Sequence, residues 1–319
     1  MSPGSKNKSF LRERTNVADR KQNLWLRARM VQSIRAFFVD REYLEVETPQ
    51  LISAPAPEAH IETIGAAGRY LQPSPELCMK RLLASGYPRI FQISKCFRKG
   101  ERGVRHLPEF SLLEWYRTGI DYGELMEECE MLIPFVSQRL NRGETITYQG
   151  REIDLKRPWE RLSVTAAFDR YARVSLQRAL EEGRFDQVMV EEIEPHLGMT
   201  RPTFLYDYPA CMAALARLKP GNETVAERFE IYLAGLELAN GFSELRDPVE
   251  QRARFEAVRQ SRRGGTAGKE TDPMPESFLR SLQDMPEAAG IALGVDRLAM
   301  VFFDAPDIDH VVSFTPEEA

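Results

Sequence analysis

An arginine, a polar loop and an alternating segment lie close together between positions 97 and 116, and their side chains could bind a phosphate and an amine. In a strand, residues two apart share a face, so Phe110, Glu114 and Tyr116 would line one surface. A carboxylate and a phenol beside an aromatic ring suit a small ammonium group next to a flat base. Arg98, which precedes the loop, suits a polyphosphate.

A second group of chemically useful side chains lies between Glu237 and Glu244, in the run ELANGFSE. Asn240-Gly241 is a strong hairpin signal, and a turn there would pair position 237 with position 244. A bulge at Gly241 would also bring the two carboxylates side by side. Adjacent carboxylates repel unless a cation lies between them, and Mg²⁺ held with nucleotide phosphates fits that position. Taken alone, the pattern favours an exposed hairpin with two surface glutamates over a metal site.

Several helices and strands are expected to position these residues. Apolar residues at helical spacing predict an amphipathic helix from 19 to about 41, followed by a strand at Tyr43–Thr48. Ser-Pro-Glu opens a second helix over 74–84, because serine caps a helix, proline fits its first turn and glutamate complements its positive end. A third helix is predicted over 121–140, where Pro134 should kink it or end it early.

The rest of the chain carries less recognisable chemistry. Residues 145–222 alternate short helical patterns with a strand at Thr203–Tyr208, which we interpret as a small helical insertion in one catalytic domain spanning 19–319. Residues 1–18 are polar and basic and are predicted to form a flexible tail. The glycine- and charge-rich stretch 261–275 is predicted to be a mobile loop.

Composition restricts the function classes that fit. The chain has 319 residues, of which 43% are hydrophobic and 29% charged, with a net charge of −5. No apolar run approaches the roughly 18 residues of a membrane span, and no secretion signal is visible. Four scattered cysteines predict reduced thiols in the cytoplasm rather than a zinc site. The acidic balance supplies no general basic field for RNA, which makes tRNA an unlikely partner.

Three ordered stretches resemble the three motifs of class II aminoacyl-tRNA synthetases of the lysyl type. The first is Phe38-Val39-Asp40-Arg41 leading into LEVETP, the second is the arginine, loop and E-x-Y strand described above, and the third is GIALGVDRL at 290–298. The resemblance spans nearly the whole chain and implies an α+β fold, a mostly antiparallel sheet flanked by helices. It also implies a homodimer built on the first motif.

The resemblance further implies residue roles and two cofactors, ATP as co-substrate and Mg²⁺. Arg98, Glu237, Glu244 and Arg297 would be catalytic, with Mg²⁺ on Glu237 and Glu244. ATP would contact Arg98, Lys99, Gly100, His106, Leu107, Phe110, Glu237, Leu238, Gly294 and Arg297. The amino-acid substrate would contact Ser74, Pro75, Glu76, Glu114, Tyr116, Glu244 and Ala292. Phe110 and Arg297 would sandwich adenine, Arg98 would hold the α-phosphate, and His106 would meet the outer phosphates.

Some positions depart from the family pattern. The usual Arg-Asn-Glu of the second motif is Arg98-Lys99-Gly100, and the usual His-Asn-Pro has Leu107 in its centre, which puts the exact nucleotide contacts in doubt. Ala292 stands where lysyl-tRNA synthetases usually have glycine. One added methyl on the pocket wall could reshape it for an amino group shifted by one carbon.

The short segment before the first motif bears on the acceptor. Lysyl-tRNA synthetases carry an anticodon-reading β-barrel there, whereas about 20 residues precede the predicted helix in this chain. The chain therefore resembles the short paralogues that attach (R)-β-lysine to a lysine of elongation factor P. The predicted activity is ATP-dependent activation of lysine or (R)-β-lysine as an adenylate, followed by that transfer. A truncated enzyme that charges tRNA and an inactive paralogue with a regulatory binding role remain as alternatives.

Overall fold

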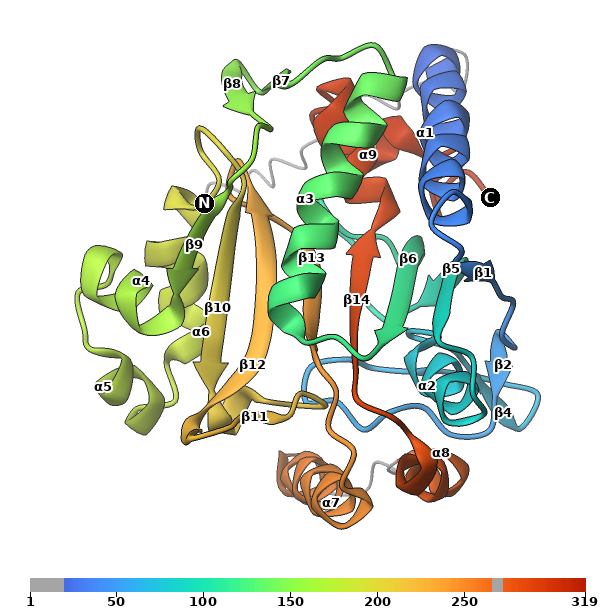
Figure 1. Cartoon of the computed structure of the whole chain (residues 1–319), viewed down its shortest axis with the longest axis vertical. Coiled ribbons are helices and arrows are strands. Elements are labelled where there is room, and N and C mark those ends of the chain that lie inside the picture. The colour runs from blue at the N-terminus through green and yellow to red at the C-terminus, as the bar shows by residue number, and fades with distance from the viewer. Residues whose placement is uncertain (1–19, 266–271) are drawn as a thin grey trace, which may run out of the picture.

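A nine-stranded sheet organises the computed structural model, which describes residues 20–265 and 272–319 (Figure 1). The strands follow the order β1-β5-β6-β14-β13-β12-β10-β9, and β11 pairs with β12. They are β1 Leu44–Glu45, β5 Arg89–Phe97, β6 Glu109–Thr118, β9 Glu160–Ser163, β10 Thr203–Pro209, β11 Leu218–Lys219, β12 Asn222–Leu233, β13 Leu236–Ser243 and β14 Ala288–Gly294. Only the β1–β5 and β10–β9 pairs are parallel, so the predicted mostly antiparallel α+β sheet is confirmed.

Smaller sheets and the helices surround this sheet. Two short sheets consist of β2 Leu51–Ile52, β3 Ile64–Ala66 and β4 Arg69–Leu71, and of β7 Thr145–Tyr148 and β8 Arg151–Asp154. The α-helices are α1 Lys21–Val39, α2 Glu76–Ala84, α3 Tyr122–Arg139, α4 Val164–Tyr171, α5 Leu176–Glu181, α6 Phe185–Val188, α7 Pro248–Gly265, α8 Glu276–Ser281 and α9 Val295–Phe303. Within the described ranges, no helix combines the length and the apolar character that a membrane crossing requires.

The two faces of the sheet bury different helices. Trp115 of β6 packs into the main core with α1, α3 and α9, and α3 crosses the front of the sheet in Figure 1. Tyr116, the next residue, packs into a second cluster with Phe255 of α7 and Phe278 of α8. Neighbouring residues of a strand point to opposite faces of the sheet. The face that carries Trp115 is therefore covered by the apolar helices α1 and α3, and the polar side chains Glu114 and Tyr116 lie on the opposite face, where a site can form.

Helix α3 begins at a capping box and continues through a proline. The Asp121 carboxylate accepts from the backbone N–H groups of Gly123 (2.7 Å) and Glu124 (3.2 Å), and the Glu124 carboxylate accepts from the Asp121 N–H. Pro134 lies inside the helix, which runs on to Arg139. Of the two predicted outcomes, a kink or an early end, the early end does not occur, and the apolar face buried against the sheet explains why the helix tolerates the proline.

The turn between β12 and β13 corrects the predicted hairpin. It consists of Ala234 and Gly235, both with positive φ (51° and 69°), as in a two-residue type I′ turn. Asn240 and Gly241 instead lie inside β13, where Gly241 pairs with Phe229. A side chain at position 241 would lie 2.8 Å from the Phe229 ring, so this glycine serves close packing rather than a turn.

The other predictions about the elements have mixed outcomes. The first two helices are confirmed, and the strand after the first shortens to Leu44–Glu45. Within 145–222, the predicted strand at Thr203–Tyr208 is confirmed as β10. β9 and β10 extend the main sheet, and the short helices α4–α6 pack beside them. The predicted tail 1–18 lies outside the described residues. Of the loop predicted over 261–275, the first five positions belong to α7 and positions 266–271 lie outside the described residues.

We expect Gly241→Ala to lower the free energy of unfolding by about 1–3 kcal/mol, because the new methyl overlaps the Phe229 ring and Ile291. Urea denaturation would measure the change. Gly103→Ala is the matched control, since a methyl there meets nothing within 4 Å. Equal stability of both variants would contradict the close-packing role of Gly241.

Candidate active site

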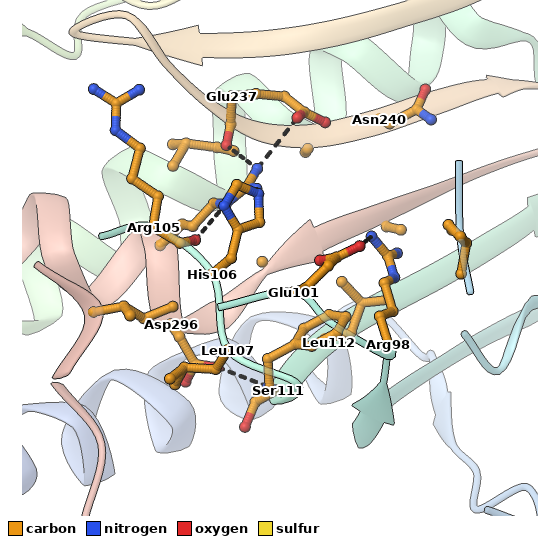
Figure 2. A pocket seen from close by; sticks show the side chains of 18 of the residues that line it. Arg98, Glu101, Arg105, His106, Leu107, Ser111, Leu112, Glu237, Asn240 and Asp296 are labelled. Atoms are coloured by element: carbon orange, nitrogen blue, oxygen red, sulfur yellow. Dashed lines mark hydrogen bonds and ion pairs between the residues drawn. The ribbon is translucent and has the colours of Figure 1, made fainter. Parts of the chain in front are cut away.

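A cleft opens where the loop between β5 and β6 faces β13 and the β14–α9 junction (Figure 2). It brings together nine of the residues predicted to contact ATP or substrate: Arg98, His106, Leu107, Phe110, Glu237, Leu238, Ala292, Gly294 and Arg297. Segments nearly 200 residues apart in sequence therefore share one wall. The strands β6, β14 and β13, adjacent in the sheet, supply the floor.

Lys99 and Gly100 do not line this cleft, although the sequence predicted that they contact ATP. Both are exposed. The Lys99 N–H donates to the carbonyl of Glu62 (2.8 Å), and Gly100 adopts a φ of 77°. This turn of the backbone directs the following loop across the cleft while its first two residues stay outside.

Arg297 contacts both sides of the cleft, β13 and the loop between β5 and β6. Its guanidinium donates to the carbonyl oxygen of Glu237 (2.8 Å) and to the carboxylate of the same residue (3.2 Å). It also lies 2.6 Å from Nε2 of His106 in the loop between β5 and β6. Burial lowers the pKa of His106, and the positive charge of Arg297 lowers it further. The imidazole is therefore neutral near pH 7 and can accept from the guanidinium.

Arg98 faces an aromatic ring and a carboxylate in the same cleft. Its guanidinium carbon lies 5.0 Å from the centre of the Phe110 ring, and its Nη1 lies 3.8 Å from the Glu101 carboxylate. Figure 2 shows Arg98 and Glu101 pointing toward one another. A long ion pair of this kind is weak, so the guanidinium is available to an incoming anion.

Asp296 is a cleft residue that the sequence analysis missed. Its buried carboxylate accepts from Arg27 of α1 (2.6 Å) and from the backbone N–H of Ser111 in β6 (2.7 Å). The hydrogen bond to Ser111 lies at the base of the cleft in Figure 2. Asp296 thereby fixes the start of α9, and with it Arg297, against β6. Its position directly before Arg297 was the available signal.

A buried carboxylate lies on β6, the strand that supplies Phe110 and Leu112 to the cleft. Glu114 is fully buried and accepts from Ser74 Oγ (2.6 Å) and Tyr116 OH (2.8 Å), as expected for side chains on one strand face. Burial raises the pKa of Glu114 to about 8, and the nearby charge of Glu76 adds to the rise. Ser74 also accepts from the Glu76 N–H (3.0 Å), which links the start of α2, with Pro75 as its cap residue, to β6.

Lys80 was not predicted, and it holds two of the predicted substrate residues. Its ammonium lies 2.5 Å from the carboxylates of both Glu76 and Glu244 and 4.8 Å from the centre of the Phe242 ring. Burial lowers the pKa of Lys80, but the two carboxylates outweigh burial and leave that pKa raised. Burial raises the pKa of Glu244 to about 8. The i,i+4 spacing of Glu76 and Lys80 was the sequence signal for this pair.

Gly290 makes room for this buried cluster. A side chain there would lie 2.1 Å from the Tyr116 ring and 2.9 Å from the Glu244 carboxylate. Two residues along β14, Ala292 pairs with Glu114 on one side and with Asn240 on the other. The predicted position of Ala292 on the wall between the buried carboxylate and the cleft is therefore consistent with its register.

Glu237 and Glu244 do not lie side by side. A β-bulge interrupts β13 between Glu237, which pairs with Tyr232, and Ala239, which pairs with Ile231. The bulge places both carboxylates on one face of the sheet, but seven residues of extended chain, roughly 20 Å, separate their backbones. Glu237 bonds Arg297 and Glu244 pairs with Lys80, so the metal set of these two residues lacks the geometry on which it was predicted. Glu230 of β12 lies on the same face as Glu237, and its carboxylate accepts from Arg228 (2.6 Å) and from the Tyr232 hydroxyl (2.7 Å). Burial raises the pKa of Glu230, and the neighbouring charge of Glu237 raises it further. In the part of the chain that the structure describes, no group of three or more candidate metal ligands occurs.

Comparison of the sequence with known proteins identifies the family of the chain. The family model of class II tRNA synthetases (D, K and N) matches residues 7–318. The chain belongs to this family.

Within the class II synthetases, relatives of two kinds match the chain. The elongation factor P–(R)-β-lysine ligase of Proteus mirabilis is 39% identical over 92% of this chain and 94% of its own length. The protein of the same name from Vibrio cholerae is 38% identical over 90% and 93%. The lysine–tRNA ligase of Moorella thermoacetica is 36% identical over 92% of this chain, and the match spans 65% of that enzyme.

We expect this synthetase to release protons when it binds lysine at pH 7. With a pKa of about 8, Glu114 is mostly protonated in the free protein at pH 7, whereas an ammonium ligand holds it ionised. Affinity should therefore rise with pH through about 8 and fall in acid. Calorimetry at pH 7 in two buffers of different ionisation enthalpy would measure the release. Glu114→Gln should reduce it, and binding without proton release at pH 7 would contradict the assignment.

Proposed function

We propose that this protein is an ATP-dependent ligase that activates lysine or (R)-β-lysine as an aminoacyl-adenylate and transfers the acyl group to a lysine of elongation factor P. The observation that carries the proposal is the buried Glu114, held by Ser74 and Tyr116, on the strand that also supplies Phe110 and Leu112 to the arginine-lined cleft. The relatives named for this ligase activity, which match over more than nine-tenths of their length, support the acceptor.

ATP would occupy the cleft. The adenine would lie between Phe110 and Arg297, both of which line the cleft, and the α-phosphate would lie on Arg98. His106 would donate to the outer phosphates after Arg297 releases it. Lys99 and Gly100 lie outside the cleft lining, so their contribution would be limited to positive charge and loop shape near its entrance.

Glu230 and Glu237 would hold Mg²⁺ in this ligase. The test of fit is geometric: Glu230 and Glu237 lie on one face of the β12–β13 pair, because Tyr232, two residues from Glu230, pairs with Glu237. A cation between the two carboxylates would relieve their repulsion and would take the place of Arg228, whose guanidinium lies 2.6 Å from Glu230. Bound there, Mg²⁺ would neutralise charge on the nucleotide phosphates. Glu244, which the sequence placed in the metal set, would belong to the amino-acid pocket instead.

The amino-acid pocket would be built from the buried cluster. Glu114 and Tyr116 would bind the ammonium at the far end of the side chain, with Glu244 behind them. Glu76 would face the other amino group, at the start of α2. Buried carboxylates bind an ammonium strongly because neither partner keeps its hydration shell.

The chemistry then requires positioning rather than a general base. The substrate carboxylate is already ionised at pH 7 and attacks the α-phosphorus of ATP, forming the adenylate and releasing pyrophosphate. Arg98 would orient the phosphate and stabilise the charge that develops on it. The amine of the acceptor lysine would then attack the acyl carbon and release AMP.

We also propose that the protein is a homodimer in the cytoplasm. Trp25 and Val39 of α1 and Leu44 of β1 are large apolar residues with exposed fractions of 68%, 59% and 49%. Val39 and Leu44 lie in or beside the segment resembling the first class II motif, and Trp25 lies in the helix that leads into it, so a partner covering all three would form the dimer contact. The free cysteines suit a reducing compartment.

A two-step assay tests the proposed function. The protein should catalyse ATP–pyrophosphate exchange with a lysine isomer, and elongation factor P should gain the mass of one lysyl group on a lysine. Arg98→Ala should lower exchange at least 100-fold, as expected for loss of phosphate positioning. Exchange followed by transfer to tRNA, with none to elongation factor P, would support a lysine–tRNA ligase instead. Absence of exchange with every isomer would support an inactive paralogue.

We expect Ala292→Gly to shift the ratio of kcat/KM values toward α-lysine by about tenfold or more, because the methyl lies on the wall beside Glu114. Exchange kinetics with α-lysine and (R)-β-lysine would measure the ratio. Ala289→Gly is a control in the same strand, where the residue is buried in the core away from the cleft. Unchanged selectivity in Ala292→Gly would mean that another residue sets the preference.

A further inference from the structure

We infer that Glu58 binds the amino group nearest the reacting carboxylate and so helps to discriminate between lysine isomers, an inference that rests on the proposed ligase function. The sequence analysis assigned no role to this residue. Glu58 lines the nucleotide cleft together with Arg98, and it also lines the small pocket formed by Ser74 and Glu76 at the start of α2. It therefore stands at the junction of the ATP site and the amino-acid site.

The segment that carries Glu58 is fixed in place at its far end. Arg262 of α7 donates to the carbonyl of Ile61, and the carbonyl of Glu62 accepts from the Lys99 N–H (2.8 Å). The hydroxyl of Thr63 donates to Asp272 (3.0 Å). These contacts fix the residues that follow Glu58, so a carboxylate lines both pockets although it lies outside any helix or strand.

Glu58 differs from the other carboxylates of the site in its lack of a partner. Glu114 accepts from Ser74 and Tyr116, whereas Glu76 and Glu244 share the ammonium of Lys80. Among the residues that the structure describes, the Glu58 carboxylate makes no hydrogen bond or ion pair. It is thus the acidic group that a substrate amine can reach without displacing an internal contact.

The surroundings of Glu58 also fit a cationic ligand. Burial raises its pKa to about 7, the charge of Arg98 lowers it, and the charge of Glu76 raises it again. An ammonium placed between Glu58 and Glu76 would relieve their repulsion and keep both ionised. Arg98 lines the same cleft as Glu58, where it would receive the phosphate and the attacking carboxylate.

The positions of the charged groups on the substrate indicate which end of the site each group would occupy. Lysine and β-lysine each carry two ammonium groups and one carboxylate. The carboxylate must lie near Arg98 to reach the α-phosphorus, and the distant ammonium would lie on Glu114 and Tyr116. The second ammonium then lies one or two carbons from the carboxylate, close to Glu58. Moving it by one carbon changes its reach to Glu58, while the distant contacts stay the same.

Exchange kinetics with a diamine substrate and its monoamine analogue test this assignment. The analogue is 6-aminohexanoate, which is lysine without the amino group nearest the carboxylate. We expect Glu58→Gln to lower kcat/KM for the preferred lysine isomer about 10- to 100-fold, as for loss of one charge-assisted hydrogen bond. Activity with 6-aminohexanoate should stay within twofold, and Glu58→Asp should recover part of the loss. Glu62→Gln, an exposed glutamate outside the cleft lining, is the matched control.

The exchange kinetics distinguish whether Glu58 binds the substrate amino group. Equal losses with lysine and 6-aminohexanoate, or no loss with either, would overturn the assignment of Glu58. A wild-type protein that exchanges with lysine but does not modify elongation factor P would overturn only the acceptor in the proposed function, because the Glu58 comparison remains valid. Absence of wild-type exchange with both isomers would overturn the two together.

Discussion

The burial of Glu114 is the constraint on which the rest of the site depends. A carboxylate removed from water is costly unless its oxygens find donors, and here Ser74 and Tyr116 supply them. Ser74 belongs to the start of α2 and Tyr116 to β6, so the same two hydrogen bonds that satisfy the charge also dock the helix on the sheet. The pKa of Glu114 remains raised because these two hydrogen bonds do not fully offset the cost of burial. An ammonium ligand would supply the missing stabilisation of the charged carboxylate.

A glycine in β14 makes room for this arrangement of side chains. The absence of a side chain at Gly290 lets the Tyr116 ring and the Glu244 carboxylate approach the backbone of β14. Lys80 then balances Glu244 and Glu76 from the opposite side. The groups proposed to bind phosphate and amine consequently lie on one pair of strands: Arg98 and Phe110 lie at one end of the β5–β6 pair and Tyr116 at the other.

Sequence reasoning succeeded where a short-range pattern decides the geometry. The two-residue period placed Glu114 and Tyr116 on one face and Trp115 in the core, and the structure confirms both. It failed where a local signal competes with packing. Asn240-Gly241 has the composition of a turn, yet the Phe229 ring and Ile291 need the missing side chain inside β13, and the turn forms at Ala234-Gly235.

By itself, the sequence determined the family, the α+β class and the residues of the β5–β6 loop and the β14–α9 junction, because these follow from contiguous motifs and from strand period. Only the tertiary structure decided which charges meet. It separated Glu237 from Glu244, brought Glu230 to the former and Lys80 to the latter, and left Glu58 free at the cleft. Strand register and chain crossings set such pairs, and neither can be read from the spacing of residues along one segment.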